Sequence, residues 1–410
     1  MTPLSSIVLT INAGSSSIKF TAFAANVAGG LSSLASGEIE DLGATVHGAH
    51  GLIQSASGEK TEVSFDPKLG PVDHRAAMNV ILDWLRKRGY DSQVVAIGHR
   101  VVHGGPNLTA PVLIDSAVLA ELRRLIPLAP LHEPHHISGI EAAIEAFPSI
   151  PEVACFDTSF HRAHPFVADT FALPRSYYDE GVRRYGFHGL SYEYITQKLR
   201  TIVPEIARGN VIIAHLGNGA SMCGVHDGRS IDSTMGFTAL DGLPMGTRCG
   251  QIDPGVLLFL MAHRKMSADE ISDLLYKNSG LKGMSGISQD MRELEGSNSP
   301  AARDAVAYFV TRIRRELGAL AAALAGVDAV VFTAGIGEHA WKVREAVLTG
   351  MEWVGIHIDA EANRANAQII SAKNSPTTVF VIPTDEELMI AEHTIKTAGV
   401  AGKEIMRASA

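Results

Sequence analysis

The feature that most constrains the fold is a strand, turn and strand pattern that occurs twice, half the chain length apart. The first copy is IVLTINAGSSSIKF, residues 7–20, and the second is NVIIAHLGNGASMCGV, residues 210–225. In each copy an apolar run leads into a turn of small residues and then into a second short strand, which is the pattern of a β-hairpin. The chain is therefore expected to contain two hairpins in corresponding places.

The two hairpins favour an internal duplication. Gly14 and Ser16 of the first copy align with Gly219 and Ser221 of the second. A chance match is the alternative, because turns of Gly and Ser are common. We favour a duplicated α/β domain with a ligand held between the copies, where pockets are commonly found.

The first turn has the composition of a phosphate-binding loop. Backbone amides, Ser hydroxyls and the Lys19 ammonium can meet an anion. The P-loop pattern GxxxxGK[ST] is not met, however, and a strand follows the turn instead of a helix. We expect Asn12 at the end of the first strand and Lys19 just inside the second. An ordinary turn with a surface lysine remains the alternative.

Size and charge exclude several classes of protein. A chain of 410 residues with 46% hydrophobic residues can fill two cores. The net charge of −9 and the lack of a basic run argue against a nucleic-acid surface. Three cysteines are too few for a disulfide framework, and no apolar run reaches the ~18 residues of a membrane span. We expect a soluble cytoplasmic protein with no membrane partner.

Other strands end in polar turns. The apolar runs 153–156 and 329–333 lead into Asp157-Thr-Ser and Ala334-Gly-Ile-Gly-Glu, the second of which is expected to form a glycine turn. In open α/β sheets, ligands bind at the carboxyl ends of the strands. Helices are expected over 301–325 and 340–350 from the spacing of their apolar residues. This alternation favours an α/β architecture.

Two motif matches are set aside. His132-Glu-Pro-His-His136 satisfies HExxH, but the proline indicates that a helix begins there and leaves His132 outside it. A zinc site needs both histidines on one continuous helix, and no third ligand is evident. Gly335-Ile-Gly337 lacks the third glycine of a dinucleotide fingerprint, although it suits close approach of a nucleotide.

Cationic and acidic residues follow strands or lie between glycines in four further segments. These are GHRVVHGG with Arg100 and His103, RRYGFHG with His188, GTRCG with Arg248, and VFVI leading into PTDEE. Each residue alone is more often structural. Together they supply what phosphoryl transfer needs, namely cations for the moving group, carboxylates for magnesium and glycine turns for the nucleotide.

These motifs resemble those of the acetate kinases. The segments TINAGSSSIKF, GHRVVHGG, FDTSFH, RRYGFHG, HLGNGAS, GTRCG, DMR, TAGIGE and PTDEEL occur in that family's order between residue 7 and about residue 392. The family belongs to the acetate and sugar kinase, heat-shock chaperone and actin superfamily. The resemblance implies duplicated ribonuclease H-like domains of the actin-like ATPase type flanking a nucleotide cleft. The expected domains are residues 1–157, completed by 387–410, and a nucleotide-binding domain over 158–386.

The resemblance also implies roles for residues where the motifs match. Asn12 and Glu386 would bind Mg²⁺, with Mn²⁺ as a possible substitute, and Arg100 would pair with the substrate carboxylate. Asp157 would be the essential carboxylate; ionised acetate needs no general base, so we prefer a positioning or metal-ordering role to proton transfer. His188 and Arg248 would stabilise the transition state, while Val102, Leu131 and Phe187 would line the acyl pocket. The ATP or ADP contacts would be Lys19 and the Ser15–Ser17 turn, His215, Leu216, Gly217, Asn218 and Gly219, Asp290, Met291 and Arg292, and Gly335, Ile336, Gly337, Glu338 and His339.

The implied activity is reversible, Mg-dependent, direct in-line transfer of the ATP γ-phosphoryl group to acetate. The resemblance also implies a homodimer.

Three residues depart from the usual family pattern: His339 in GIGEH, Ala239 in place of a proline of the acyl pocket, and Gln251 in place of an Asp. One methylene in an apolar pocket separates substrates by about 1–3 kcal/mol. A propionate or butyrate kinase therefore stays open, and an ATP-driven conformational switch is a more distant alternative.

Overall fold

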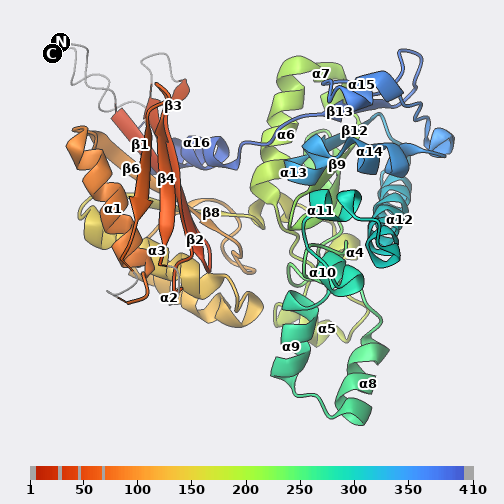
Figure 1. Ribbon diagram of the computed structural model, residues 1–410, viewed down its shortest axis with the longest axis horizontal. Helices are drawn as coiled ribbons and strands as arrows, with labels where there is room; N and C mark the ends of the chain where they lie inside the picture. The colour runs from red at the N-terminus through yellow and green to blue at the C-terminus, as the bar shows by residue number, and fades with distance from the viewer. Residues whose placement is uncertain (1–5, 26–29, 45–47, 67–69, 401–410) are drawn as a thin grey trace. The chain divides into compact units, whose positions relative to one another are not determined.

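The computed structural model describes residues 6–25, 30–44, 48–66 and 70–400, which form two compact units (Figure 1). The first unit consists of the described residues within Met1–Ser159 and Asp385–Ala410, and the second is Phe160–Thr384. The expected domain ends at residues 1 and 410 lie outside the described residues. No helix within the described ranges has the length and apolar content needed to cross a bilayer.

The first unit is built on an eight-stranded sheet of order β5-β4-β3-β2-β1-β6-β8-β7. Strands β1 to β5 pair antiparallel in sequence, whereas β1, β6 and β8 are parallel neighbours. The strands are β1 (Ser6–Ala13), β2 (Ser17–Ala25), β3 (Leu31–Glu40), β4 (His50–Ser55), β5 (Lys60–Ser64), β6 (Val94–Val101), β7 (Val112–Leu113) and β8 (Glu152–Phe156). The helices are α1 (His74–Lys87), α2 (Ser116–Leu125), α3 (Glu133–Ala146) and α16 (Glu386–Ala398).

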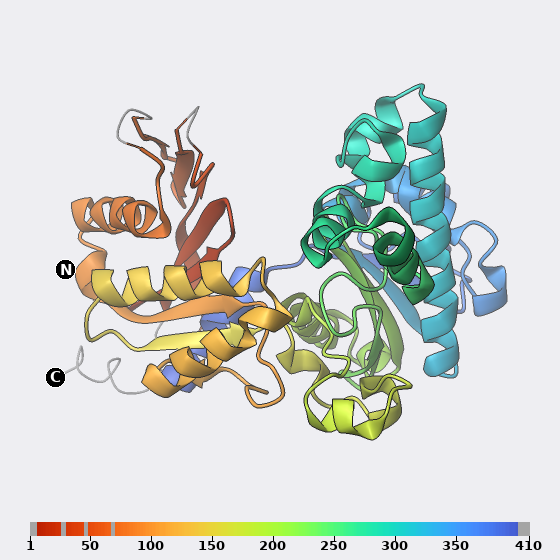
Figure 2. The ribbon, with the colours of Figure 1, turned by 90° about the horizontal axis from the view of Figure 1, so that it is seen from below.

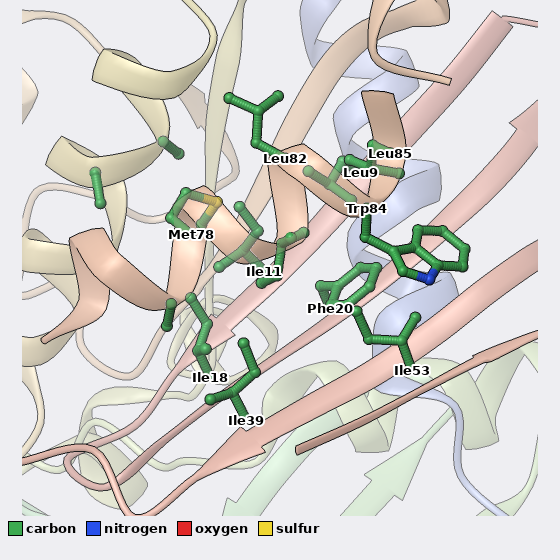
Figure 3. Close-up of a cluster of buried hydrophobic side chains, with 14 of the residues drawn as sticks. Leu9, Ile11, Ile18, Phe20, Ile39, Ile53, Met78, Leu82, Trp84 and Leu85 are labelled. Carbon is green, nitrogen blue, oxygen red and sulfur yellow. The ribbon is translucent and has the colours of Figure 1, made fainter. Parts of the chain in front are cut away.

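The two faces of this sheet are covered by different helices. Alternate residues of β1 separate the faces, because successive side chains of a strand point to opposite sides. Leu9 and Ile11 pack with helices α1 and α3, while Val8 packs with Ala391 of α16. Figure 3 shows the larger core, in which side chains of α1 meet those of the strands. Its labelled members are Leu9, Ile11, Ile18, Phe20, Ile39, Ile53, Met78, Leu82, Trp84 and Leu85.

The second unit contains a five-stranded sheet of order β11-β10-β9-β12-β13. Its faces are covered by α6 and by α12, the long cyan helix of Figure 2. The strands are β9 (Asn210–Leu216), β10 (Ala220–His226), β11 (Arg229–Ser233), β12 (Ala329–Thr333) and β13 (Thr378–Val381). The helices are α4 (Phe166–Asp169), α5 (Arg175–Asp179), α6 (Gly189–Ile202), α7 (Pro204–Ala207), α8 (Pro254–Arg264), α9 (Ala268–Lys277), α10 (Gly280–Ser285), α11 (Met291–Gly296), α12 (Pro300–Ala323), α13 (Ala334–His339), α14 (Trp341–Leu348) and α15 (Ala360–Arg364).

The expected duplication is confirmed by strand order. Strands β3-β2-β1-β6-β8 of the first unit correspond to β11-β10-β9-β12-β13 of the second, each with antiparallel pairing up to the central strand and parallel pairing beyond it. The residue alignment is wrong by two positions, however. Ala13 pairs with Ile18 and Leu216 with Ala220, so the loop that begins at Gly14 corresponds to the loop that begins at Gly217. In both loops the backbone N–H of that first glycine donates within the loop, to Ser17 or to Gly219.

Most of the expected elements are present. Both hairpins, the strands ending at Phe156 and Thr333, and helices α12 and α14 lie within a few residues of their expected ranges. The glycine turn expected at Gly335–Gly337 is wrong, because this segment is helix α13. Ala334 adopts a left-handed φ of 63°, which redirects the chain so that a helix begins directly after β12.

Candidate functional site

In the first unit, three predicted site residues stand at the carboxyl ends of adjacent parallel strands. Ile11 of β1 lies beside His99 of β6, so Asn12 and Arg100 are the next residues along the two strands. Val101 lies beside Phe156 of β8, and Asp157 follows directly. Since parallel strands end at one edge of the sheet, the register gathers these three residues there.

Arg100 is held by two carboxylates. Its Nε and Nη2 donate to the two oxygens of Asp157 at 3.0 and 2.7 Å, a bidentate pair, and its Nη1 lies 3.6 Å from Glu386 Oε2. Burial by itself would lower the pKa of Arg100, but the Asp157 and Glu386 carboxylates outweigh it and raise that pKa above its ordinary value. Arg100 is therefore a fixed, charged group whose Nε–Nη2 edge is occupied by Asp157, which leaves the Nη1–Nη2 edge as the one that can face a further carboxylate.

Three carboxyl groups, those of Asp157, Glu386 and Glu387, lie near this single arginine. Glu386 is the first residue of α16, and its neighbour Glu387 has a raised pKa because of burial and then because of the Glu386 charge. The described residues hold no cluster of three or more His, Cys, Asp or Glu side chains arranged for a metal ion. A magnesium site in a kinase needs only one or two carboxylates, since phosphates and water complete the shell. The hard oxygens of Asn12 and Glu386 fit that role.

The hairpin β1–β2 places Asn12 opposite Lys19. Directly opposed residues of an antiparallel pair project from the same face of the sheet. The ammonium of Lys19 lies 3.1 Å from Glu38 of β3, and its side chain is half exposed. The carbonyl of Gly14 at the turn is in hydrogen-bond contact with His74 Nε2 at 2.8 Å, which anchors the loop to α1.

The expected start of a helix at the HExxH match is confirmed. Helix α3 begins at Glu133, with His132 as its N-cap and Pro134 in the first turn. Glu133 is fully buried and accepts from the backbone N–H of His103 at 3.0 Å. Of the expected acyl-pocket residues, Val102 is buried after β6 and Leu131 is half-buried before α3. Phe187, which is also buried, belongs to the second unit.

In the second unit, the expected nucleotide residues come from two adjacent parallel strands. His215 of β9 lies beside Thr333 of β12, so the hairpin loop after β9 and helix α13 after β12 start at the same sheet edge. A Cβ on Gly217 would lie 3.7 Å from Ala334 Cβ, so the hairpin loop lies close to the start of α13. The structure therefore brings the 215–219 and 335–339 segments together.

His188 is fixed by a polar network that the sequence did not indicate. Its Nδ1 is in hydrogen-bond contact with Ser221 Oγ at 2.7 Å, and the Tyr192 hydroxyl is bonded to the same oxygen. The His188 ring stacks on His215 with 4.2 Å between centroids. His215 Nδ1 contacts Ser191 Oγ at 2.8 Å. The strand position of Ser221 beside the loop was the available signal, but no spacing identified Ser191 or Tyr192.

Arg248 and His188 approach the same glycine. A Cβ added to Gly219 would lie 3.2 Å from Arg248 Nη2 and 3.3 Å from His188 Nε2. Arg248 Nη1 donates to the Ala239 carbonyl at 2.6 Å, which fixes the guanidinium from the other side. The two groups predicted to stabilise the transition state thus both lie beside the loop of residues 217–219.

The Asp290–Arg292 segment is the first turn of α11. Asp290 caps the helix by accepting from the Arg292 N–H at 2.8 Å, and Arg292 pairs with the same carboxylate. The hydrogen bond to Arg292 lowers the pKa of Asp290. Met291 is buried, so only its neighbours face solvent. A Cβ on Gly246 would contact both Asn218 and Gln289, so this segment lies near the second hairpin loop.

Two of the residues that depart from the usual family pattern, Gln251 and His339, differ in their contacts. Gln251 Oε1 accepts from Arg312 Nη2 at 2.6 Å and from Arg315 Nη2 at 3.4 Å, both on α12. His339 is exposed at the C-terminal end of α13. Gln251 therefore ties its loop to α12, whereas His339 is available to solvent or ligand.

Comparison with known proteins covers nearly the whole chain. The Acetokinase family model matches residues 7–392. A protein of Methylocella silvestris, described as an acetate kinase, is 57% identical over 401 residues, which cover 96% of this chain and 98% of that protein. An acetate kinase of Nitrobacter hamburgensis is 52% identical over 391 residues, covering 95% of each chain.

Solved structures of acetate and propionate kinases are also similar to this chain over nearly its whole length. A propionate kinase from Francisella tularensis has a TM-score of 0.88 at 36% identity, over 95% of this chain and 99% of that chain. Porphyromonas gingivalis acetate kinase has a TM-score of 0.85 at 38% identity, over 96% of this chain and 100% of that chain. This chain therefore belongs to the acetokinase family.

Proposed function

We propose that this chain transfers the γ-phosphoryl group of ATP to a carboxylate oxygen of acetate, giving acetyl phosphate and ADP, and that it also catalyses the reverse reaction. The observation that carries the proposal is its 57% identity to an acetate kinase over 96% of the chain. The domains we propose are residues 1–157 with 387–410, and residues 158–386.

In this proposal the first unit holds the acceptor. Asp157 holds the Nε–Nη2 edge of Arg100 in a bidentate pair, and the Nη1–Nη2 edge of the guanidinium would meet the acetate carboxylate. Val102 and Leu131 contribute apolar surface toward the acyl methyl group. Asp157 is engaged by a permanent cation and acetate is already ionised, so a positioning role for Asp157 follows more naturally than proton transfer.

The second unit supplies charge stabilisation. Arg248 and His188 both lie beside Gly219. Arg248 donates a hydrogen bond to the Ala239 carbonyl, and His188 is in hydrogen-bond contact with Ser221. Donors fixed in advance lower the energy of charge that develops on the equatorial oxygens of a moving phosphoryl group. The nucleotide would contact the 215–219, 290–292 and 335–339 segments and Lys19, while Phe187 would complete the acyl pocket.

Asn12 and Glu386 would hold Mg²⁺, and Mn²⁺ suits the same oxygen ligands. When bound, the ion neutralises charge on the phosphate oxygens. The excess of carboxylates around Arg100 supports this assignment, because Glu386 and Glu387 add negative charge that one guanidinium does not balance.

Propionate is the second candidate acceptor. It is favoured by the likeness to a propionate kinase structure and by Ala239, whose methyl group takes less room than the proline ring usual in this family. Acceptor preference thus depends on the room around residue 239.

One assay tests the function directly. ADP formation from MgATP is followed with acetate, propionate and butyrate in parallel, and any acyl phosphate is trapped as its hydroxamate. Carboxylate-dependent ADP with matching hydroxamate is expected, with acetate as the best acceptor. ADP formation that every acid leaves unchanged, without hydroxamate, would remove the kinase proposal in favour of an ATP-driven switch.

We further propose a homodimer that works in the cytoplasm. Helix α8 supports the dimer, because it has no buried residue and exposes Val256, Leu258, Phe259 and Met261. The cytoplasmic location is supported by the three cysteines, all within the described ranges, which form no disulfide.

A further inference from the structure

Arg344 on α14 is a buried cation that has no acidic partner among the residues the structure describes. Among the fully buried side chains of the described residues, that of Arg344 belongs to the residue of largest volume. No carboxylate of the described residues forms an ion pair with it. Burial lowers its pKa to about 10, so it still carries its charge at neutral pH. A buried charge is costly unless hydrogen bonds satisfy it fully.

All five N–H donors of this guanidinium are used. Nη1 donates to the carbonyls of Gly337 at 2.8 Å and Glu338 at 2.9 Å. Nε and Nη2 donate to the side-chain and backbone oxygens of Asn363, each at 2.9 Å. Nη2 also donates to Asn366 Oδ1 at 2.6 Å. Through a single side chain on α14, the five bonds join α13 to α15 and to Asn366, which follows α15.

We propose that Arg344 is a positioning residue for the nucleotide: it fixes the 335–339 segment so that the segment can receive ATP or ADP. This inference rests on the proposed function, which assigns nucleotide contacts to those residues. A six-residue helix has too few internal hydrogen bonds to hold its own shape, and its last carbonyls lack partners within the helix. Arg344 bonds two of those carbonyls from the buried side.

The arrangement favours positioning over simple stability. An apolar side chain at residue 344 would stabilise a core without the desolvation of a charge. Two of the five bonds end instead on the backbone of the predicted nucleotide segment, and the opposite side of that segment is open. Gly335 is exposed, and a Cβ there would meet no heavy atom within 4 Å. Arg344 therefore hydrogen-bonds the 335–339 segment on its buried side, while Gly335 on the exposed side of the segment remains accessible to a nucleotide.

The test compares wild type with Arg344→Lys, measuring KM for ATP, KM for acetate, ADP affinity by calorimetry, and melting temperature. Lysine keeps the charge but cannot make five bonds in a planar fork. We expect KM for ATP and Kd for ADP to rise about tenfold or more, with KM for acetate within about twofold of wild type. A lower melting temperature with the ratio of the two KM values unchanged would mean that Arg344 only stabilises the fold, and would overturn the proposal.

A gentler variant guards against loss of folding. Asn366 has a left-handed φ of 51°, so Asn366→Gly suits the backbone and removes one of the five bonds. It should raise KM for ATP a few-fold without changing KM for acetate, and an unchanged KM for ATP would contradict the proposal. Arg312→Lys is the matched control: Arg312 is also buried but bonds Gln251 and Glu316, so KM for ATP should stay at the wild-type value.

Gly335→Val separates this inference from the proposed function. The Cβ of the new side chain would meet no heavy atom of neighbouring segments within 4 Å, so the variant should raise KM for ATP only if a nucleotide lies over the segment. If this variant and Arg344→Lys both leave KM for ATP unchanged while wild type makes acetyl phosphate, the positioning inference fails and the proposed function stands. If wild type makes no acyl phosphate and binds no ADP, the proposed function fails first.

Discussion

At the scale of single residues, the second unit gathers the two groups that we propose as charge-stabilising around a position that has no side chain. Arg248 and His188 both reach within 3.3 Å of where a Cβ of Gly219 would stand, and Ser221 and the Ala239 carbonyl hold them there. Glycine at residue 219 thus makes room for two cationic or donor groups at one point.

Gly219→Ala should therefore lower kcat. A methyl group 3.2 Å from Arg248 Nη2 and 3.3 Å from His188 Nε2 must displace both groups by a few tenths of an ångström. Misplaced donors lose transition-state stabilisation, so we expect kcat to fall about tenfold to a hundredfold. Steady-state kinetics and a melting curve measure the change. Unaltered kcat in a folded variant would show that these two groups do not act over Gly219.

Residue 239 is expected to tune the acceptor. Ala239→Pro adds a ring at the expected acyl pocket, while its carbonyl can still accept from Arg248. The acetate over propionate ratio of kcat/KM should rise, by roughly fivefold to tenfold, because one methylene is worth about 1–3 kcal/mol at most. Ala239→Gly is the opposite change and should lower the ratio. Equal ratios in all three proteins would place residue 239 away from the acyl group.

At the scale of elements, the strands and hairpins could be predicted from the sequence. The polar side chains that hydrogen-bond the site residues could not. Apolar runs such as 329–333 identify buried strands, and the small residues after them identify loops. The sequence does not show that Gly335–Gly337 forms a helix, because no pattern marks the left-handed Ala334 or shows that the Arg344 side chain bonds the carbonyls of this segment. Ser191, Tyr192 and Arg344 have no motif, since their contacts arise only when helices pack.

Helix α3 introduces a buried carboxyl group with consequences for pH. Burial raises the pKa of Glu133 to about 8 from an ordinary value of 4.5, and the Asp157 charge contributes in the same direction. Between these two pH values the folded protein keeps a proton that the unfolded chain releases. Folding is therefore less favourable as pH rises through this window, by about 1.4 kcal/mol per pH unit.

Glu133→Gln should remove this pH dependence. Glutamine can still accept from the His103 N–H but does not ionise. Below about pH 4.5 the two proteins should be similarly stable, and the variant should become progressively more stable than wild type up to about pH 8. Urea unfolding at pH 5.5 and 7.5 measures the gap. Parallel pH profiles for the two proteins would show that Glu133 is not buried as a neutral acid.

At the scale of the whole molecule, the repeated hairpin was enough to indicate duplication, because each copy keeps its strand, turn and strand pattern. The two-residue error in the alignment has a simple origin: matching glycines and serines ignored the strand register, which aligns Gly14 with Gly217. The outer strand β4 and the edge strands β5 and β7 were not predicted, because none of them has a continuous buried run. The exposed face of α8 also could not be found from periodicity, since its sequence is apolar nearly all round.

That helix carries the last prediction. The sequence PGVLLFLMAHR has no buried residue, and Leu258, Phe259 and Met261 are 67%, 49% and 52% exposed. Single exposed apolar residues are normal, but several on one short helix form a patch, and we expect this patch to be the dimer interface. A second copy would cover it with the same patch across a two-fold axis. Wild type should be a dimer at micromolar concentration by sedimentation, and Leu258→Asp should be a folded monomer, because a buried interface charge without a partner is unfavourable. His263→Gln, on the same helix, should stay dimeric, whereas a Leu258→Asp dimer would place the interface elsewhere.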